Sequence, residues 1–220
     1  MKRVVTPELL DTDLGTPAEV DETLRDLTRI NRWFGGVSTT CRMLKRVSCT
    51  HPELTLLDVG AGSGDVSLSS ARQLGSQARV RVTLLDRIPG HMPLNGASRI
   101  AGDALALPFL DASFDLVTCS LLVHHLEPDQ IVRFVNEALR VARIAVLLND
   151  LRRDARHLAL MYIGFPFFGR LTRNDGVASV RRSYTPEEMQ SILSQTSAAS
   201  VELENHYLFR MGIIAWKTAA

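Results

Sequence analysis

The sequence predicts an α/β fold: a Rossmann-like, doubly wound, mostly parallel sheet of seven strands with an antiparallel last strand. Two observations predict it. Short apolar strand segments alternate with segments whose apolar residues recur at helical spacing, which is typical of a parallel sheet with right-handed crossovers. The first strand also ends in a glycine turn, residues 60–64, that leads straight into a helix. We therefore expect ligands beyond the carboxyl ends of the strands.

The chain begins with a helical region. Val20, Leu24, Leu27 and Ile30 predict a helix over residues 17–34, which Gly35 and Gly36 terminate. A short second helix is expected over residues 40–47. The alternating units follow, with strands at residues 54–59, 80–85, 99–101, 114–119 and 144–148, a helix at 65–74 and another from Pro128.

The end of the chain predicts the antiparallel pair. Residues 185–188, Thr-Pro-Glu-Glu, form a capping box that starts a helix. Strands at 201–209 and 212–217 follow, and their short connection through Arg210 and Met211 predicts a hairpin. We divide the single domain into an N-terminal helical cap (1–50), a core (51–150), a lid insertion (151–184) and a C-terminal helix and strand pair (185–220).

Bulk properties exclude several classes. The 220 residues carry a formal net charge of +1, which argues against a general nucleic-acid binder. No apolar run reaches membrane-spanning length, and the N-terminus lacks the apolar core of a signal peptide, so we expect no stable membrane insertion. Three scattered cysteines have no metal-ligand spacing, which favours reduced thiols, a cytoplasmic location and no metal. A monomer or a homodimer is equally compatible with these data.

The glycine turn carries the most specific signal. Asp58, Gly60, Ala61 and Gly62 lie in the pattern D-x-G-x-G-x-G, whereas a dinucleotide fingerprint requires G-x-G-x-x-G. Asp86 closes the second strand, where a carboxylate can accept from both ribose hydroxyls. Asp103 and Ala104 follow the third strand, where a carboxylate and an amide can bind an adenine edge.

This order and spacing resemble the class I S-adenosylmethionine-dependent methyltransferases. The segments 112–117 and 122–126 bring the resemblance closest to the ubiquinone/menaquinone-biosynthesis type, which methylates small organic molecules. The resemblance implies S-adenosylmethionine as the cofactor, bound by Asp58, Gly60, Ala61, Gly62, Asp86, Arg87, Asp103, Ala104 and Ser120. A non-catalytic S-adenosylmethionine-binding module is the alternative of another class.

The reaction needs an acceptor and, for a phenol or enol, a base. His124 and His125 follow the fourth strand and are the candidate catalytic residues, because imidazole accepts protons near neutral pH. The alternative is that they only pack or orient the loop. Asp150 either contacts the acceptor or caps the lid, and His91 is expected to be a loop residue.

The lid combines an apolar aromatic run with arginines, and we expect it to cover the acceptor. Arg152, Tyr162 and Trp33 are the candidate acceptor residues, with Arg153 beside Arg152 and a core anchor as the alternative for Trp33. The expected acceptor is a small, largely apolar molecule, aromatic, phenolic or polyketide-like. Methylation is expected at oxygen, with carbon methylation of a quinol-type ring as the alternative.

Overall fold

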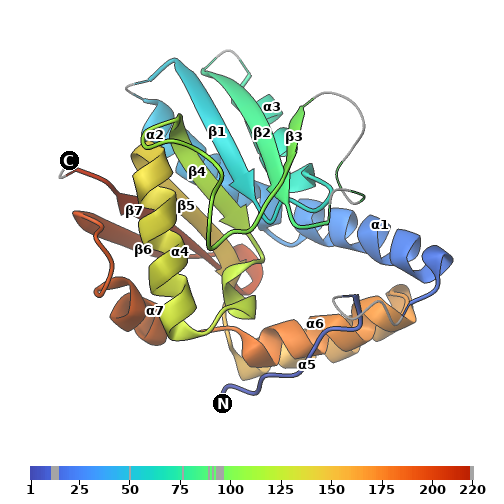
Figure 1. Ribbon diagram of the computed structural model, residues 1–220. Coiled ribbons are helices and arrows are strands. Elements are labelled where there is room, and N and C mark those ends of the chain that lie inside the picture. The colour runs from blue at the N-terminus through green and yellow to red at the C-terminus, as the bar shows by residue number, and fades with distance from the viewer. Residues whose placement is uncertain are drawn as a thin grey trace.

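A single seven-stranded sheet forms the centre of the computed structural model, which describes residues 1–10, 15–49, 51–75, 77–88, 90, 92 and 97–218. The strand order is β3-β2-β1-β4-β5-β7-β6 (Figure 1), and only β7 runs opposite to the others. The strands are β1 (Glu53–Val59), β2 (Arg79–Asp86), β3 (Ser98–Ala101), β4 (Phe114–Ser120), β5 (Ala142–Leu151), β6 (Ser200–His206) and β7 (Arg210–Trp216). The predicted fold class is confirmed.

Helices cover both faces of the sheet. They are α1 (Pro17–Trp33), α2 (Gly36–Ser48), α3 (Asp65–Leu74), α4 (Pro128–Val141), α5 (Ala155–Gly164), α6 (Arg170–Arg182) and α7 (Pro186–Leu193). Figure 1 shows α2 and α3 behind the sheet, α4 and α7 in front of it, and α5 and α6 beyond the carboxyl ends of the parallel strands. The lid segment is therefore helical and lies at the edge where ligands are expected.

Each face of the sheet has its own apolar core. On the α4 and α7 side, Phe134 and Ile131 are fully buried against inward-facing residues such as Val117. On the α2 and α3 side, Leu44 and Leu56 are fully buried. Neighbouring β-strand residues alternate between these two cores because successive side chains point to opposite faces. Burial on both faces makes β1, β4 and β5 a rigid support for the residues at their ends.

The turn between α1 and α2 differs from the prediction. Gly35 alone takes a left-handed conformation, with φ of +85°, and α2 begins directly afterwards at Gly36 rather than at residue 40. A Cβ at Gly35 would lie 2.7 Å from the carbonyl oxygen of Tyr207. Glycine is therefore required there for both its conformation and its lack of a side chain.

The hairpin connection also differs from the prediction. β6 ends at His206, and the turn is made by residues 207–209 instead of Arg210 and Met211, which belong to β7. Leu208 and Phe209 take φ values of +50° and +60° without being glycine or asparagine. The sequence contains no residue typical of such a turn, so its position could not be predicted from turn chemistry.

The predicted helix α1 is confirmed, but its buried residues are polar. Thr23, Asp26 and Asn31 are buried, whereas Leu24 and Leu27 are only half-buried. Asp26 accepts hydrogen bonds from the Thr172 hydroxyl at 2.9 Å and from a backbone amide at the start of α6. These bonds hold α1 against α6 and leave the apolar residues of α1 on another side of the helix.

Candidate active site

The glycine loop between β1 and α3 is tied to the end of β2. The amides of Gly60 and Ala61 both donate to the carbonyl of Leu85, at 2.9 and 3.1 Å. Gly60, Gly62 and Gly64 have φ values of +66°, +51° and +66°, a conformation that favours glycine. A Cβ added at Gly62 would meet no atom within 4 Å. The loop therefore exposes bare backbone at Gly62, where a ligand can approach closely.

Asp86 stands beside this open backbone. One oxygen of its carboxylate accepts from the Gly62 amide at 2.8 Å and the other from the Ile88 amide at 2.9 Å. Each carboxylate oxygen has two acceptor lone pairs, so both bonds leave capacity for ribose hydroxyls. Arg87 follows Asp86 and is exposed. The position of Asp86 fits the predicted ribose contact.

Asp103 lies at the same edge, one strand further out. The amide of Gly102 donates to the Asp86 carbonyl at 3.1 Å, which places the segment after β3 next to the end of β2. Asp103 is exposed, and its Oδ1 accepts from the Leu105 amide at 2.8 Å, while Ala104 is half-buried. This turn fixes the carboxylate in the neighbourhood predicted for adenine. Ser120, half-buried, ends β4 at the same edge of the sheet.

Asp58 lies beneath the glycine loop with only 3% of its surface exposed. Burial raises the pKa of Asp58 to about 7; the Ser67 hydroxyl lowers it, and the nearby charges of Asp65 and Asp86 raise it further. Three carboxylates thus gather around one loop. The negative charges of Asp65 and Asp86 favour a ligand that carries positive charge at this end of the site, while Asp58 stays largely protonated below pH 7.

His124 is buried in a charge cluster, with 2% of its surface exposed. Its Nδ1 lies 2.6 Å from Oδ1 of Asp150, and its Nε2 lies 3.5 Å from Oε1 of Glu8. Burial lowers the pKa of His124, but the charge and hydrogen bond of Asp150, and then Glu8, raise it to about 9. The ring is therefore an imidazolium at neutral pH, which cannot accept a proton.

This geometry corrects the expectation that His124 is a catalytic base. Both ring nitrogens face carboxylates, and the Asp150 carboxylate also accepts from the backbone amide of His124 at 3.1 Å. Asp150 is 2% exposed and binds the turn after β4, not the lid. We assign His124 and Asp150 a positioning role: they fix the backbone that presents the next residue, His125.

His125 occupies a different environment from its neighbour. Its side chain is 22% exposed, and its Nε2 lies 3.6 Å from the same oxygen of Glu8. The two imidazole rings lie 4.3 Å apart, so His125 rests on the buried His124 ring. Of the two histidines, His125 is the one with the exposed ring surface.

The same cluster offers three possible metal-ligand atoms, one each from Glu8, His124 and His125. These atoms lie within 4.8 Å of one another, close enough to bind one metal ion. Glu8 already accepts from the Ser179 hydroxyl at 2.6 Å, and the guanidinium of Arg182 lies 3.9 Å from the same oxygen. A neighbouring guanidinium repels a metal cation. We therefore interpret the group as a charge-paired cluster and keep the expectation of no metal.

Comparison with known proteins places this geometry in a family. The methyltransferase domain family matches residues 56–144. A ubiquinone/menaquinone biosynthesis C-methyltransferase of Methylobacterium nodulans is 28% identical over 205 residues, covering 79% of this chain and 77% of that protein. A SAM-dependent methyltransferase from Aquifex aeolicus superimposes with a TM-score of 0.58 at 16% identity, covering 89% of this chain and 97% of that one.

The chain belongs to the class I S-adenosylmethionine-dependent methyltransferases. The predictions of an enzyme of this class and of S-adenosylmethionine as its cofactor are confirmed. A chloroplastic 2-methyl-6-phytyl-1,4-hydroquinone methyltransferase of Oryza sativa subsp. japonica is also 28% identical, over 127 residues that cover 53% of this chain and 38% of that protein. The roles of individual residues stay predictions.

The predicted acceptor residues of this methyltransferase lie on three different elements. Trp33, at the end of α1, is 68% exposed, so the core-anchor alternative is wrong. Arg152, directly after β5, lies over the Phe209 ring, 5.5 Å from its centroid, and its side chain is 20% exposed. Tyr162 on α5 is 47% exposed, and its hydroxyl accepts from Arg181 at 3.5 Å. The structure does not bring these three side chains into contact with one another.

Arg153 has a structural role instead of the acceptor contact considered for it. It is 8% exposed, and its guanidinium donates to the carbonyls of Met1 and Ser183 and pairs with Glu188. The pairing ties the N-terminus and α7 to the end of β5. His91 lies outside the described residues.

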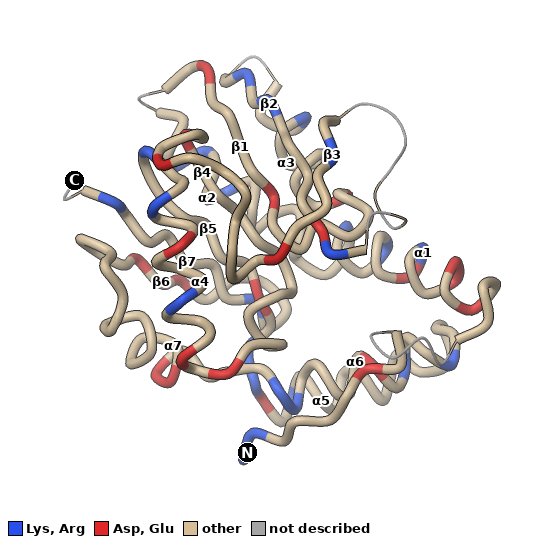
Figure 2. Tube along the Cα trace, in the orientation of Figure 1, with Lys and Arg blue, Asp and Glu red and all other residues tan. Residues whose placement is uncertain are grey.

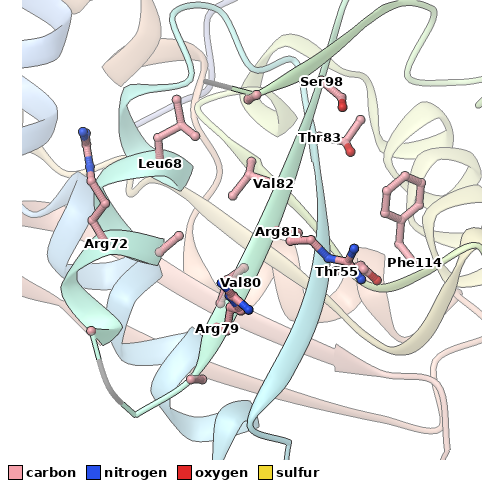
Figure 3. A pocket seen from close by; sticks show the side chains of 14 residues that line it. Thr55, Leu68, Arg72, Arg79, Val80, Arg81, Val82, Thr83, Ser98 and Phe114 are labelled. Carbon is pink, nitrogen blue, oxygen red and sulfur yellow. The ribbon is translucent and has the colours of Figure 1, made fainter. Parts of the chain in front are cut away.

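A hollow of about 860 Å³ lies away from these residues, around the amino-terminal half of β2 (Figure 3). Its lining includes Val80, Arg81 and Val82 of β2, with Leu68 of α3 and Phe114 of β4. β3 pairs only with the second half of β2, from Thr83 on, so the sheet edge is open there. None of the predicted site residues lines this hollow.

Sequence reasoning missed Glu8, Arg182 and Asn31. Glu8 reaches the histidine cluster because the N-terminal segment runs along α6, where the amides of Leu9 and Leu10 donate to Asp175. Arg182 donates to the carbonyl of His124 at 3.0 Å. No local pattern marks these residues, since the partners named for them lie at least 34 positions away in the sequence.

Proposed function

We propose that this methyltransferase transfers a methyl group from S-adenosylmethionine to a small, largely apolar acceptor with a hydroxylated aromatic ring. The observation that carries the proposal is the half-exposed His125 beside Glu8 and above the buried, cationic His124. Methyl transfer to a phenol or hydroquinone requires a positioned base that removes the hydroxyl proton. An amine acceptor does not require such a firmly held base.

The apolar side of α1 supports an apolar acceptor. Val20, Leu24 and Leu27 are half-buried and lie on the same side of the helix as Asn31, at helical spacing. Asn31 donates to the carboxylate of Asp65, at the start of α3 directly after the glycine loop, at 3.2 Å. The apolar side of α1 therefore runs toward the cofactor loop, where an acceptor ring has to lie.

The chain's own residues then have three tasks. The lid and α1 hold the ring in line with the sulfonium methyl group and exclude water. His125 takes the proton of a ring hydroxyl, and the carboxylate of Glu8 stabilises the resulting imidazolium. S-Adenosylmethionine, when bound beside the glycine loop, would supply an already activated methyl group and leave as S-adenosylhomocysteine.

Loss of the hydroxyl proton places negative charge on oxygen and on the ring carbons ortho and para to it, so either kind of atom can receive the methyl group. Methylation at carbon gives a dienone, and the proton on that carbon must then leave, with reprotonation of the oxygen, to restore the aromatic ring. The sequence analysis put oxygen first. We now put a ring carbon first, because the relative that covers 79% of the chain is named a ubiquinone/menaquinone biosynthesis C-methyltransferase. Oxygen remains the second candidate.

The test uses S-adenosylmethionine labelled with ¹³C in its methyl group. The protein is incubated with a substituted hydroquinone, with the same ring carrying two methoxy groups, and with a primary amine of similar size. We expect S-adenosylhomocysteine and a labelled ring methyl with the hydroquinone alone; a labelled methoxy carbon would indicate oxygen. Transfer to the amine or to the dimethoxy compound would contradict a deprotonated ring acceptor. Cofactor binding without transfer to any of the three compounds would contradict the proposed acceptor class.

A further inference from the structure

More than half of the large apolar side chains that the described residues expose belong to two segments of this protein. The described residues expose eleven large apolar side chains, and six of them belong to the N-terminal segment or to α5 and the turn after it. These six are Met1, Val4, Val5, Tyr162, Ile163 and Phe167. Ile163 and Phe167 are 71% and 80% exposed. We call these six residues the α5 surface.

Two contacts show that the two parts of the α5 surface adjoin. The amide of Val4 donates to the carbonyl of Arg181 at 3.0 Å, and the guanidinium of Arg181 donates to the Tyr162 hydroxyl at 3.5 Å. Arg181 therefore lies between the N-terminal segment and α5. Met161, the neighbour of Tyr162, points the other way and packs on Gly176 of α6.

Basic charge surrounds the same surface. Residues 151–184 contain seven arginines and only two acidic residues, although the whole chain has a net charge of +1. Arg173 and Arg181 are exposed on α6. Arg170 and Arg156 are exposed as well, but they pair with Glu19 and Asp154, each at 2.9 Å. Figure 2 shows basic residues along α5 and α6.

We propose that the α5 surface binds an anionic lipid bilayer and holds the enzyme peripherally on it. Exposed aromatic and aliphatic side chains insert at the level of the headgroups, while neighbouring arginines pair with lipid phosphates. No described helix is long and apolar enough to cross a membrane, so the contact is interfacial. This proposal does not depend on the identity of the acceptor.

The test measures co-sedimentation of the full-length protein with vesicles of phosphatidylcholine alone or with about one third phosphatidylglycerol. We expect binding to the anionic vesicles that weakens as salt is added, because the arginine contacts are screened. Ile163→Ser with Phe167→Ser should reduce binding more than tenfold. Arg173→Glu with Arg181→Glu should also reduce binding to the anionic vesicles, by about fivefold or more for each arginine replaced.

Matched controls carry the same chemical changes elsewhere. Leu110→Ser removes a side chain that is 83% exposed on the loop before β4, and Arg79→Glu with Arg133→Glu reverses two exposed charges on β2 and α4. Binding that falls equally in the controls would overturn the assignment to the α5 surface. Every variant is checked by thermal unfolding and by its affinity for S-adenosylhomocysteine, which should equal that of the wild type.

Two further results would overturn the proposal. One is wild-type protein that binds S-adenosylhomocysteine but stays in the supernatant with anionic vesicles at low salt. The other is a protein that does not bind vesicles but forms a concentration-dependent dimer, which is lost in the Ile163→Ser, Phe167→Ser variant. The α5 surface would then bind a second copy of the chain. Absence of methyl transfer in a protein that binds vesicles would count against the proposed function alone.

Discussion

The buried His124 should make stability depend on pH in the alkaline range. Its pKa is raised from 6.5 to about 9 by Asp150 and Glu8, which outweigh the opposing effect of burial. A raised pKa means that the folded protein binds the proton more tightly than the unfolded chain. Each tenfold change in proton affinity is worth about 1.4 kcal/mol, so the effect amounts to about 3 kcal/mol. This stabilisation is complete below pH 6.5 and is lost as the pH rises through about 9.

The assay is urea unfolding between pH 6 and 10 for the wild type and His124→Gln. Glutamine is neutral at every pH, so the difference in unfolding free energy should approach 3 kcal/mol near pH 6 and shrink toward pH 10. His206 provides the control, because burial lowers its pKa and no comparable loss is expected between pH 7 and 9. A difference for His124→Gln that stays constant from pH 6 to 10 would refute the charged cluster.

Three further predictions concern the cofactor loop. Asp86→Ala should weaken S-adenosylhomocysteine binding by ~1–3 kcal/mol in calorimetry, since charge-assisted hydrogen bonds are lost; unchanged affinity would contradict the ribose contact. Gly62→Val should abolish binding and destabilise the fold less than Gly64→Val: both positions have positive φ, but a Cβ at Gly64 also lies 2.8 Å from the Leu84 side chain. Tight binding by the Gly62 variant would contradict the open backbone. Burial raises the pKa of Asp58 from 3.8 to about 7. The folded protein therefore holds this proton more tightly than the unfolded chain, and the stability present below pH 3.8 is lost as the pH rises through 7. Asp58→Asn should therefore melt higher than the wild type at pH 8 but not at pH 4, and a lower melting temperature at pH 8 would contradict the buried carboxylate.

The cofactor side of the site could be predicted because its signals are local. A strand, a glycine turn and a helix N-terminus follow one another in the sequence, and Asp86 and Asp103 fall at strand ends that a parallel sheet brings to one edge. The parallel strands followed from the alternation of elements, and the antiparallel pair of β6 and β7 from their short connection, whereas the order of the strands comes from the structure alone.

The acceptor side could not be predicted in the same way because it depends on contacts between distant segments. The pattern of two adjacent histidines gave no means of distinguishing a buried imidazolium from an accessible base. Glu8 and Asp150 decide that difference, and they lie 116 residues before and 26 residues after His124. Likewise, the helical spacing of α1 predicted the helix but not its buried side, which is set by the polar contacts of Asp26 with α6.

The most direct test of the account is single-turnover methyl transfer to a hydroquinone by the wild type, His125→Gln and His124→Gln. We expect His125→Gln to lose ~10²–10⁴-fold in rate, the usual contribution of a general base, while its stability and affinity for S-adenosylhomocysteine stay unchanged. His124→Gln should instead lose stability, with a smaller effect on the rate of the molecules that remain folded. A fully active His125→Gln variant would contradict the assignment of proton removal to His125.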